Sequence, residues 1–123
     1  MTLRDDPTVA EFEDVLATHD AVIVDFYATW CGPCKTYSPR FAQAAREARR
    51  KWPEAKVAFL KVDIDRAPEL KARYSVLGVP TTLVIRKKKG LLGGVKMAPA
   101  ERLSGNIKQP DLLDLIERVA GGA

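Results

Sequence analysis

The sequence predicts an α/β domain built on a mixed β-sheet with helices on both faces. Segments rich in apolar and β-branched residues alternate with segments whose apolar residues recur at helical spacing, which is typical of parallel βαβ pairing. The last two strand-like segments follow one another across a glycine-rich turn, which indicates an antiparallel hairpin. No internal repeat or linker divides the 123 residues, so we expect residues 1–123 to form a single domain.

The predicted elements begin with a helix. Thr8 and Glu11 have the spacing of a capping box at its start. Its apolar face is expected to contain Val9, Phe12, Val15 and Leu16. The run AVIVDFY at 21–27 is nearly continuous in apolar residues and predicts a strand covered on both faces. The pattern at 31–52 is helical, and Pro39 within it predicts a kink.

The second half continues the alternation of strands and helices. We predict a strand at 56–63, a short helix at 67–74 and a strand at 81–86. A further short strand is expected around 102–104, and a last helix at 110–120. The buried face of the last helix is expected to contain Leu112, Leu113, Ile116 and Val119.

Composition and charge exclude several classes of protein. The chain is 46% hydrophobic and 29% charged, as is typical of globular domains. It has no run of about 18 apolar residues that would predict a membrane span. Its start, MTLRDDPTVAEFED, is acidic and polar, unlike a secretory signal. We therefore expect a cytoplasmic protein without nucleic-acid or membrane partners.

Much of the net charge of +4 comes from the basic run Arg86–Lys89. We interpret this run as a solvated hairpin tip, with partner recognition as the alternative.

The two cysteines, Cys31 and Cys34, lie in the segment ATWCGPCK. A disulfide that staples a fold would enclose a longer loop. In a reducing compartment, a CxxC pair is more often redox-active or metal-binding. A structural zinc site needs four ligands, and the only histidine is His19, which we expect to be exposed at a helix end. We therefore expect no metal site and interpret the pair as redox-active, with a redox-inactive binding module as the alternative.

The spacing of the pair favours dithiol–disulfide exchange. Cys31 is at the start of a predicted helix, where the helix dipole lowers the pKa of a thiol and increases its thiolate fraction. Cys34 follows one turn later on the same face, where it can resolve a mixed disulfide formed by Cys31. Gly32 lets the intervening backbone bend, and Pro33 restricts it.

The segment VDFYATWCGPCK closely resembles the active-site region of thioredoxins. The resemblance continues through Pro39, KVDID at 61–65 and GVPT at 78–81, and covers about residues 9–90 well. It implies the thioredoxin fold and protein-disulfide reductase activity in a monomer with no bound cofactor. The chain has no GxGxxG motif, so its electrons are expected to come from another molecule. The resemblance implies that this donor is a flavin-dependent thioredoxin reductase that uses NADPH. The implied substrates are disulfide-containing proteins such as peroxidases and reductases.

The resemblance also implies roles for residues that match the family motif. Cys31 corresponds to the partly exposed nucleophile, and Cys34 to the buried resolving cysteine. Asp25 corresponds to a buried carboxylate that accepts the proton of Cys34, and burial would raise its pKa. The alternative is a carboxylate satisfied by hydrogen bonds or by Lys61, without a catalytic part. Lys61 resembles the lysine beside this carboxylate, with an ordinary surface lysine as the alternative.

A substrate-binding surface around the cysteines follows from the same resemblance. Pro80 corresponds to a cis-proline that faces them, and its conformation would leave the Val79 backbone free to pair with an extended substrate. Trp30 is expected on the surface beside Cys31, with ordinary core packing as the alternative. The full implied surface consists of Trp30, Gly32, Pro33, Gly78, Val79, Pro80 and Gly105.

Three features depart from the family pattern. Only MTLRDD precedes the opening helix, so we expect four strands, and a fifth only if these residues pair. Position 27 is Tyr where many members have Trp. Residues 87–102 are longer than a compact hairpin needs, and we interpret them as a mobile loop with Leu91, Leu92 and Met97 exposed. A partner-selective protrusion is the alternative, which would make the chain a binding or chaperone-like module with a basic hairpin. The match of Gly105 depends on alignment across this insertion.

Overall fold

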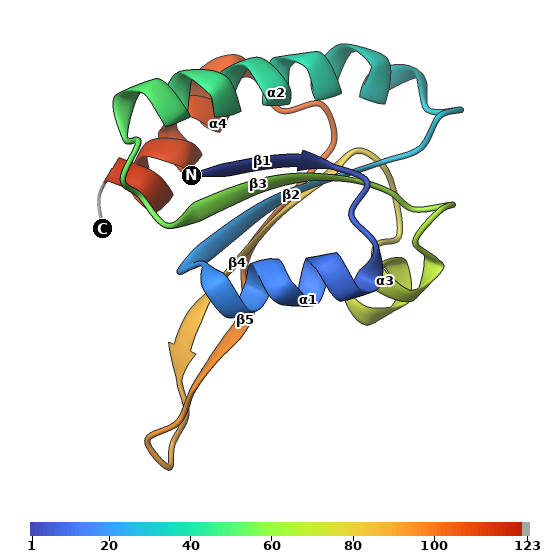
Figure 1. The fold of residues 1–123 in the computed structure, drawn as a ribbon. Coiled ribbons are helices and arrows are strands. Elements are labelled where there is room, and N and C mark those ends of the chain that lie inside the picture. The colour runs from blue at the N-terminus through green and yellow to red at the C-terminus, as the bar shows by residue number, and fades with distance from the viewer. Residues whose placement is uncertain (122–123) are drawn as a thin grey trace.

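The computed structural model, which describes residues 1–121, contains a five-stranded mixed sheet in the order β1-β3-β2-β4-β5 (Figure 1). The strands are β1 (Thr2–Asp5), β2 (Ala21–Tyr27), β3 (Val57–Asp63), β4 (Thr81–Lys89) and β5 (Val95–Ser104). β1, β3 and β2 are parallel, whereas β4 is antiparallel to both β2 and β5. The predicted mixed sheet is confirmed. The predicted single domain at 1–123 extends two residues beyond the described part.

β1 decides the number of strands. It runs parallel to β3, with Leu3 opposite Phe59, and Leu3 packs against the core. The residues MTLRDD therefore supply a short edge strand, and the sheet has five strands rather than four. His19, at the C-cap of the first helix, is half-buried rather than exposed, because its Nε2 lies 2.8 Å from Oγ1 of Thr2 in this strand.

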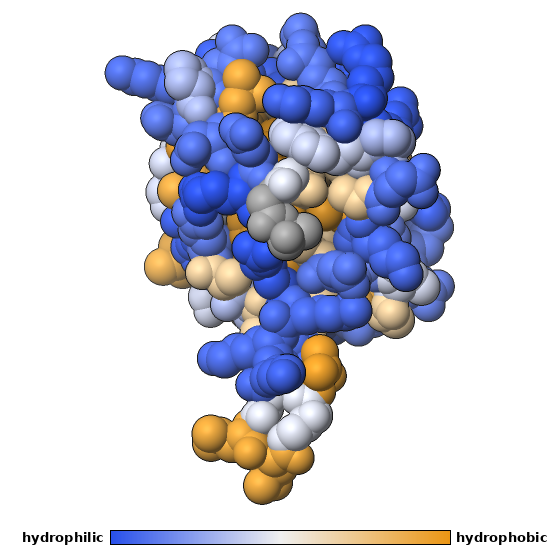
Figure 2. Space-filling model, turned by 90° about the vertical axis from the view of Figure 1, so that its left-hand side faces the viewer, coloured by the Kyte–Doolittle hydropathy of each residue, from blue (hydrophilic) through white to orange (hydrophobic). Residues whose placement is uncertain are grey.

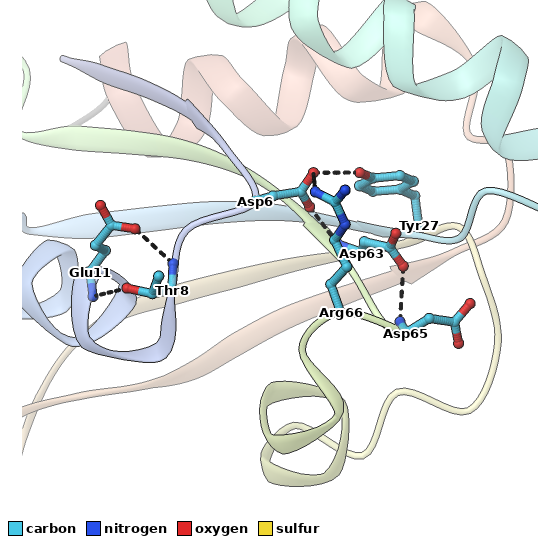
Figure 3. A network of polar contacts seen from close by, with 7 residues as sticks. All are labelled: Asp6, Thr8, Glu11, Tyr27, Asp63, Asp65 and Arg66. Atoms are coloured by element: carbon cyan, nitrogen blue, oxygen red, sulfur yellow. Dashed lines mark hydrogen bonds and ion pairs between the residues drawn. The ribbon is translucent and has the colours of Figure 1, made fainter.

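Helices cover both faces of the sheet. α1 (Val9–Thr18) and α3 (Pro68–Arg73) lie on one face, and α2 (Gly32–Lys51) and α4 (Gln109–Ile116) on the other (Figure 1). α4 continues as a π-helical turn, Glu117–Gly121. The predicted capping box at the start of α1 is present. The Glu11 amide donates to Thr8 Oγ1, and the Thr8 amide donates to Glu11 Oε1 (Figure 3).

The last helix corrects one prediction about the core. Leu113 is exposed, whereas Leu115 is fully buried. The buried residues of this helix and its continuation are Leu112, Leu115, Ile116, Val119 and Ala120. These residues recur at helical spacing, and Leu113 lies about 100° away from Leu112 around the helix, so only one of the two can face the sheet.

β4 and β5 form a longer ribbon than predicted. β5 begins at Val95 instead of 102, and the ladder pairs Lys87 with Met97 and Lys89 with Val95. β2 begins opposite Arg86, so residues 87–97 project beyond the sheet (Figure 1). We call residues 87–97 the arm. The predicted loop is thus a paired ribbon, and the basic run lies on its strand rather than at its tip. Met97 is half-buried against the core rather than exposed.

None of the helices found in residues 1–121 combines the length and the apolar composition that crossing a bilayer requires.

Candidate functional site

The cysteine pair lies where β2 passes into α2. β2 ends at Tyr27, and Cys31 is the N-cap of α2, so the pair occupies the carboxyl edge of the sheet. Cys31 and Cys34 form a disulfide with their Cα atoms 5.3 Å apart. The Cys34 amide donates a hydrogen bond to Cys31 Sγ over 3.1 Å. The helix N-terminus therefore directs an N–H group at the sulfur that would carry negative charge as a thiolate.

Cys31, which the resemblance implied to be partly exposed, is almost as buried as Cys34 in this disulfide form. Cys31 is 4% exposed and Cys34 is 2% exposed. Cys31 Sγ lies 3.6 Å from the carbonyl oxygen of Val79, so the loop before β4 covers it from one side. Gly32 and Pro33, between the cysteines, are both exposed at the start of the helix.

A groove of about 410 Å³ is lined in part by Val79, the residue whose carbonyl oxygen lies beside Cys31 Sγ. The Val79–Pro80 peptide bond is cis, as expected. The Gly105 amide donates to the Pro80 carbonyl oxygen over 2.9 Å, and Gly105 has a φ of +86°, in the region that favours glycine. The structure therefore places Gly105 next to Pro80, although the arm separates the two residues in the sequence. The groove is lined by Ser75, Leu77, Gly78, Val79, Pro80, Thr81, Arg102, Ser104 and Gly105.

Trp30 lies on the surface rather than in the core. Its side chain is 66% exposed, and its Nε1–H donates to Asp65 Oδ2 over 2.9 Å. An indole that presents its ring to solvent while its N–H is bonded supplies a flat apolar surface beside the disulfide.

Asp25 lies in the middle of β2 and is fully buried. Ser38 Oγ donates to Asp25 Oδ2 over 2.7 Å, whereas Oδ1 has no hydrogen-bond partner among the described residues. Burial raises the pKa of Asp25 to about 6, although the Ser38 hydrogen bond and the charge of Lys61 both oppose this rise. The carboxyl group can therefore exchange a proton near neutral pH.

Lys61 lies on β3 in register with Asp25. Its Nζ is 4.3 Å from the ring centroid of Tyr27, a cation–π contact. Within residues 1–121 Asp25 has no ion-pair partner, so Lys61 acts on it through its field rather than by direct contact.

Ser38 is the residue that the sequence analysis missed. It is buried on α2, four positions after Cys34 and therefore on the same helical face. Both residues line a hollow of about 330 Å³ together with Lys61. The signal that identifies Ser38 is a polar residue at this spacing within an otherwise apolar helix face.

A network of polar contacts fixes the loops beside the site (Figure 3). The hydroxyl of Tyr27 donates to Asp6 Oδ2 over 2.7 Å, and Asp6 Oδ1 accepts from the Asp63 amide over 3.0 Å. Asp63 in turn accepts from the amide of Asp65, the residue that holds Trp30. Through Asp6, which directly follows β1, Tyr27 thus ties the end of β2 to the end of β3.

Comparisons with known proteins agree with this geometry. The thioredoxin family model matches residues 6–116. Thioredoxin from Mycoplasmoides gallisepticum is 39% identical over 80 residues, which cover 65% of this chain and 74% of that protein. A bifunctional thioredoxin reductase/thioredoxin from Mycobacterium leprae is 39% identical over 75 residues, which cover 61% of this chain and 15% of that protein.

Solved structures confirm the predicted thioredoxin fold. A mutant thioredoxin from Halobacterium salinarum superposes with a TM-score of 0.74 at 28% identity, and the match covers 97% of this chain and 91% of that chain. The family match and the Cys31–Cys34 disulfide together support dithiol–disulfide oxidoreductase activity. The chain belongs to the thioredoxin family.

Proposed function

We propose that this chain reduces disulfide bonds in other proteins by dithiol–disulfide exchange. The observation that carries the proposal is the Cys31–Cys34 disulfide at the amino end of α2, beside the groove at Val79 and Pro80. In the reduced protein, the Cys31 thiolate attacks one sulfur of a substrate disulfide. A bond forms between Cys31 and that sulfur, and the other substrate sulfur leaves as a thiolate.

Cys34 completes the exchange. Its thiol loses a proton, attacks Cys31 Sγ and releases the second substrate thiolate. Two electrons then reside on the substrate, and this chain holds the Cys31–Cys34 disulfide. Asp25 is the proposed acceptor of the Cys34 proton, because its pKa of about 6 leaves it mostly ionised at neutral pH. Ser38 positions this carboxylate through its hydrogen bond, and Lys61 favours its ionised form.

The proposed substrate-binding surface surrounds Cys31. An extended substrate segment would pair with the Val79 backbone, as in β-augmentation. The exposed ring of Trp30 would supply apolar contact beside it. At Gly32, Gly78 and Gly105 a Cβ would enter open space rather than meet other protein atoms, and we propose that glycine at these positions leaves that space to the substrate. Pro33 and Pro80 complete this surface.

The proposed electron donor is a flavin-dependent thioredoxin reductase that uses NADPH. The match to a relative named as both reductase and thioredoxin supports this pairing. The proposed recipients are peroxidases, reductases with a catalytic disulfide and other oxidised proteins. We further propose that the chain acts as a cytoplasmic monomer.

The reduction potential of the Cys31–Cys34 pair tests the direction of exchange. Equilibration with glutathione or dithiothreitol buffers of defined poise should give a value near the thioredoxin level, about −270 mV. A value of about −180 mV or higher, where disulfide isomerases and oxidases lie, would contradict reduction as the function.

The exposed basic arm favours a second candidate, a binding or chaperone-like module whose redox chemistry is incidental. Replacement of both Cys31 and Cys34 by serine distinguishes the two. A reductase loses its cellular role with this change, whereas a binding module retains it.

A further inference from the structure

The arm at residues 87–97 carries side chains that the thiol chemistry does not use. Leu91 and Leu92, at its tip, are 107% and 102% exposed, and Val95 is also exposed. The tip is closed by backbone hydrogen bonds from Gly90 to Gly94 and from Gly93 to Gly90. Figure 2 shows hydrophobic surface at the end of the arm, followed by pale surface and then by hydrophilic surface towards the body of the protein. Two adjacent leucines are thus held in water at the end of an ordered ribbon.

Positive charge surrounds the ribbon behind this tip. The sequence from Arg86 to Ala100 contains no acidic residue. The cationic residues of the ribbon, which we call the collar, are Arg86, Lys87, Lys88, Lys89 and Lys96. Among the described residues, Lys87 is the only member of the collar that forms an ion pair, and its partner is Asp20.

The collar has cations on both faces of the ribbon. Successive residues of a strand point to opposite faces, so Lys87 and Lys89 occupy one face, and Arg86 and Lys88 the other. Lys96 is opposite Lys88 and shares its face. Positive charge on both faces of the ribbon, around an apolar tip, is complementary to a flat anionic surface into which the tip inserts. A protein partner that binds one side of the ribbon would need cations on one face only.

We propose that the arm docks this chain on anionic lipid bilayers, with Leu91 and Leu92 inserted at the boundary between headgroups and acyl chains and the collar at the phosphates. Interfacial apolar groups enter this boundary by about 5–10 Å, and lysines near an anionic surface add to the affinity. Lys89 immediately precedes the tip, and Lys87 is two residues further back, which corresponds to about 7 Å along a β-strand. The flexible lysine side chains can therefore reach the phosphates while the leucines insert.

This docking leaves the disulfide free to react. β4 begins at Thr81, which lies beside Pro80 and the groove, and ends at Lys89 in the arm. The rise per residue of a β-strand gives a length of about 26 Å between these two ends. Cys31, which lies beside Val79, is therefore near the end of β4 that is farther from the bilayer while the arm is inserted. The sequence alone led us to expect no membrane partner, because it does not show that leucines and cations share one projecting ribbon.

Co-sedimentation of the full chain with phosphatidylcholine vesicles, with and without phosphatidylglycerol, tests the proposal. We expect binding only to the vesicles that contain phosphatidylglycerol, and weaker binding as salt increases. Leu91→Ser with Leu92→Ser should weaken binding by about tenfold or more, because two leucines no longer leave water. Lys88→Gln with Lys89→Gln should weaken it by about fivefold per charge.

Matched control variants separate the arm from general surface properties. Leu77→Ser removes an equally exposed leucine near the groove, at the other end of β4. Lys71→Gln with Lys108→Gln removes two exposed charges in α3 and at the start of α4. Both controls should bind vesicles like the wild type, and the leucine variant of the arm should still reduce disulfides.

A second readout reports insertion directly. Leu91→Trp should show a blue shift of its emission when phosphatidylglycerol vesicles are added, beyond any shift of the wild type, which contains Trp30 and Trp52. Absence of vesicle binding, or binding that arm and control variants lose equally, would overturn the proposal. Because vesicle binding and disulfide reduction are measured separately, failure of this proposal leaves the proposed reductase function unaffected.

Discussion

Ser38 donates a hydrogen bond to one carboxylate oxygen of Asp25, and the other oxygen of Asp25 is buried without a partner in residues 1–121. A single hydrogen bond therefore stabilises a carboxylate that burial strongly disfavours. Burial raises the pKa of Asp25 to about 6 and the Ser38 hydrogen bond opposes this rise, so the two residues together set how readily Asp25 takes up a proton.

Asp25→Asn should change the pH dependence of stability. The pKa of Asp25 is about 6 in the folded chain and 3.8 when unperturbed, so the folded state holds the proton more tightly. This contribution to stability is fully present only well below pH 3.8, and it is lost as the pH rises through about 6. The free energy of unfolding of the variant, relative to the wild type, should therefore rise by about 2 kcal/mol between pH 4 and pH 7.

Urea unfolding of the oxidised proteins at several pH values measures this difference. A constant penalty from the unpartnered amide of asparagine shifts all values equally and does not affect the comparison. A difference between variant and wild type that is the same at every pH would show that Asp25 titrates normally.

Ser38→Ala should raise the pKa of Asp25 further, because it removes the hydrogen bond that favours the ionised form. A hydrogen bond to a charged group corresponds to a rise of about one pH unit or more. The midpoint of the pH profile for resolution of mixed disulfides by Cys34 should then move to higher pH. Single-turnover substrate reduction at several pH values measures this profile. Ser38→Thr keeps a hydroxyl and should restore the profile.

Thr36→Ala is the matched control for this experiment. It removes an exposed hydroxyl from the same helix, two positions before Ser38. Its pH profile should equal that of the wild type. If Ser38→Ala lowers the melting temperature but leaves the profile unchanged, Ser38 is a packing residue and does not position Asp25.

The sequence predicts the elements whose residue pattern is set by burial. The strand at 21–27 was predicted with its observed bounds, because a strand covered on both faces is apolar at nearly every position. The capping box at Thr8 was predicted because its side-chain contacts are local. Both features depend only on residues close in sequence or on burial itself.

The elements that were missed lack such a pattern. β5 is mostly exposed in the arm, so its residues show no apolar alternation, and its pairing depends on backbone hydrogen bonds to β4. Leu113 and Leu112 are equally apolar, and only tertiary packing decides which one is buried. The spacing of Ser38 on α2 marks it as a polar residue on a buried face, but its partner, Asp25, is known only when the fold brings α2 onto β2.

Cys34→Ser should trap a mixed disulfide between Cys31 and a protein substrate. The first attack still occurs, but no thiol remains to resolve the intermediate. Non-reducing electrophoresis with mass spectrometry should detect this adduct, and turnover should be lost. Cys31→Ser should give no adduct. If adducts instead form through Cys34 in that variant and not through Cys31 in the other, the proposed roles of the two cysteines are reversed.

Gly105→Ala should weaken substrate binding through the groove. Gly105 has a φ of +86° and open space where a Cβ would lie, so the cost of alanine is backbone strain of about 1–2 kcal/mol. Relief of that strain would move its amide away from the Pro80 carbonyl oxygen. The KM for a protein disulfide should rise by about fivefold, the effect of one hydrogen bond.

Gly93→Ala is the matched control, because it places the same strain at φ +87° in the tip of the arm, and it should leave the KM unchanged. Equal effects of the two variants on KM would indicate that general destabilisation, rather than the groove, is responsible.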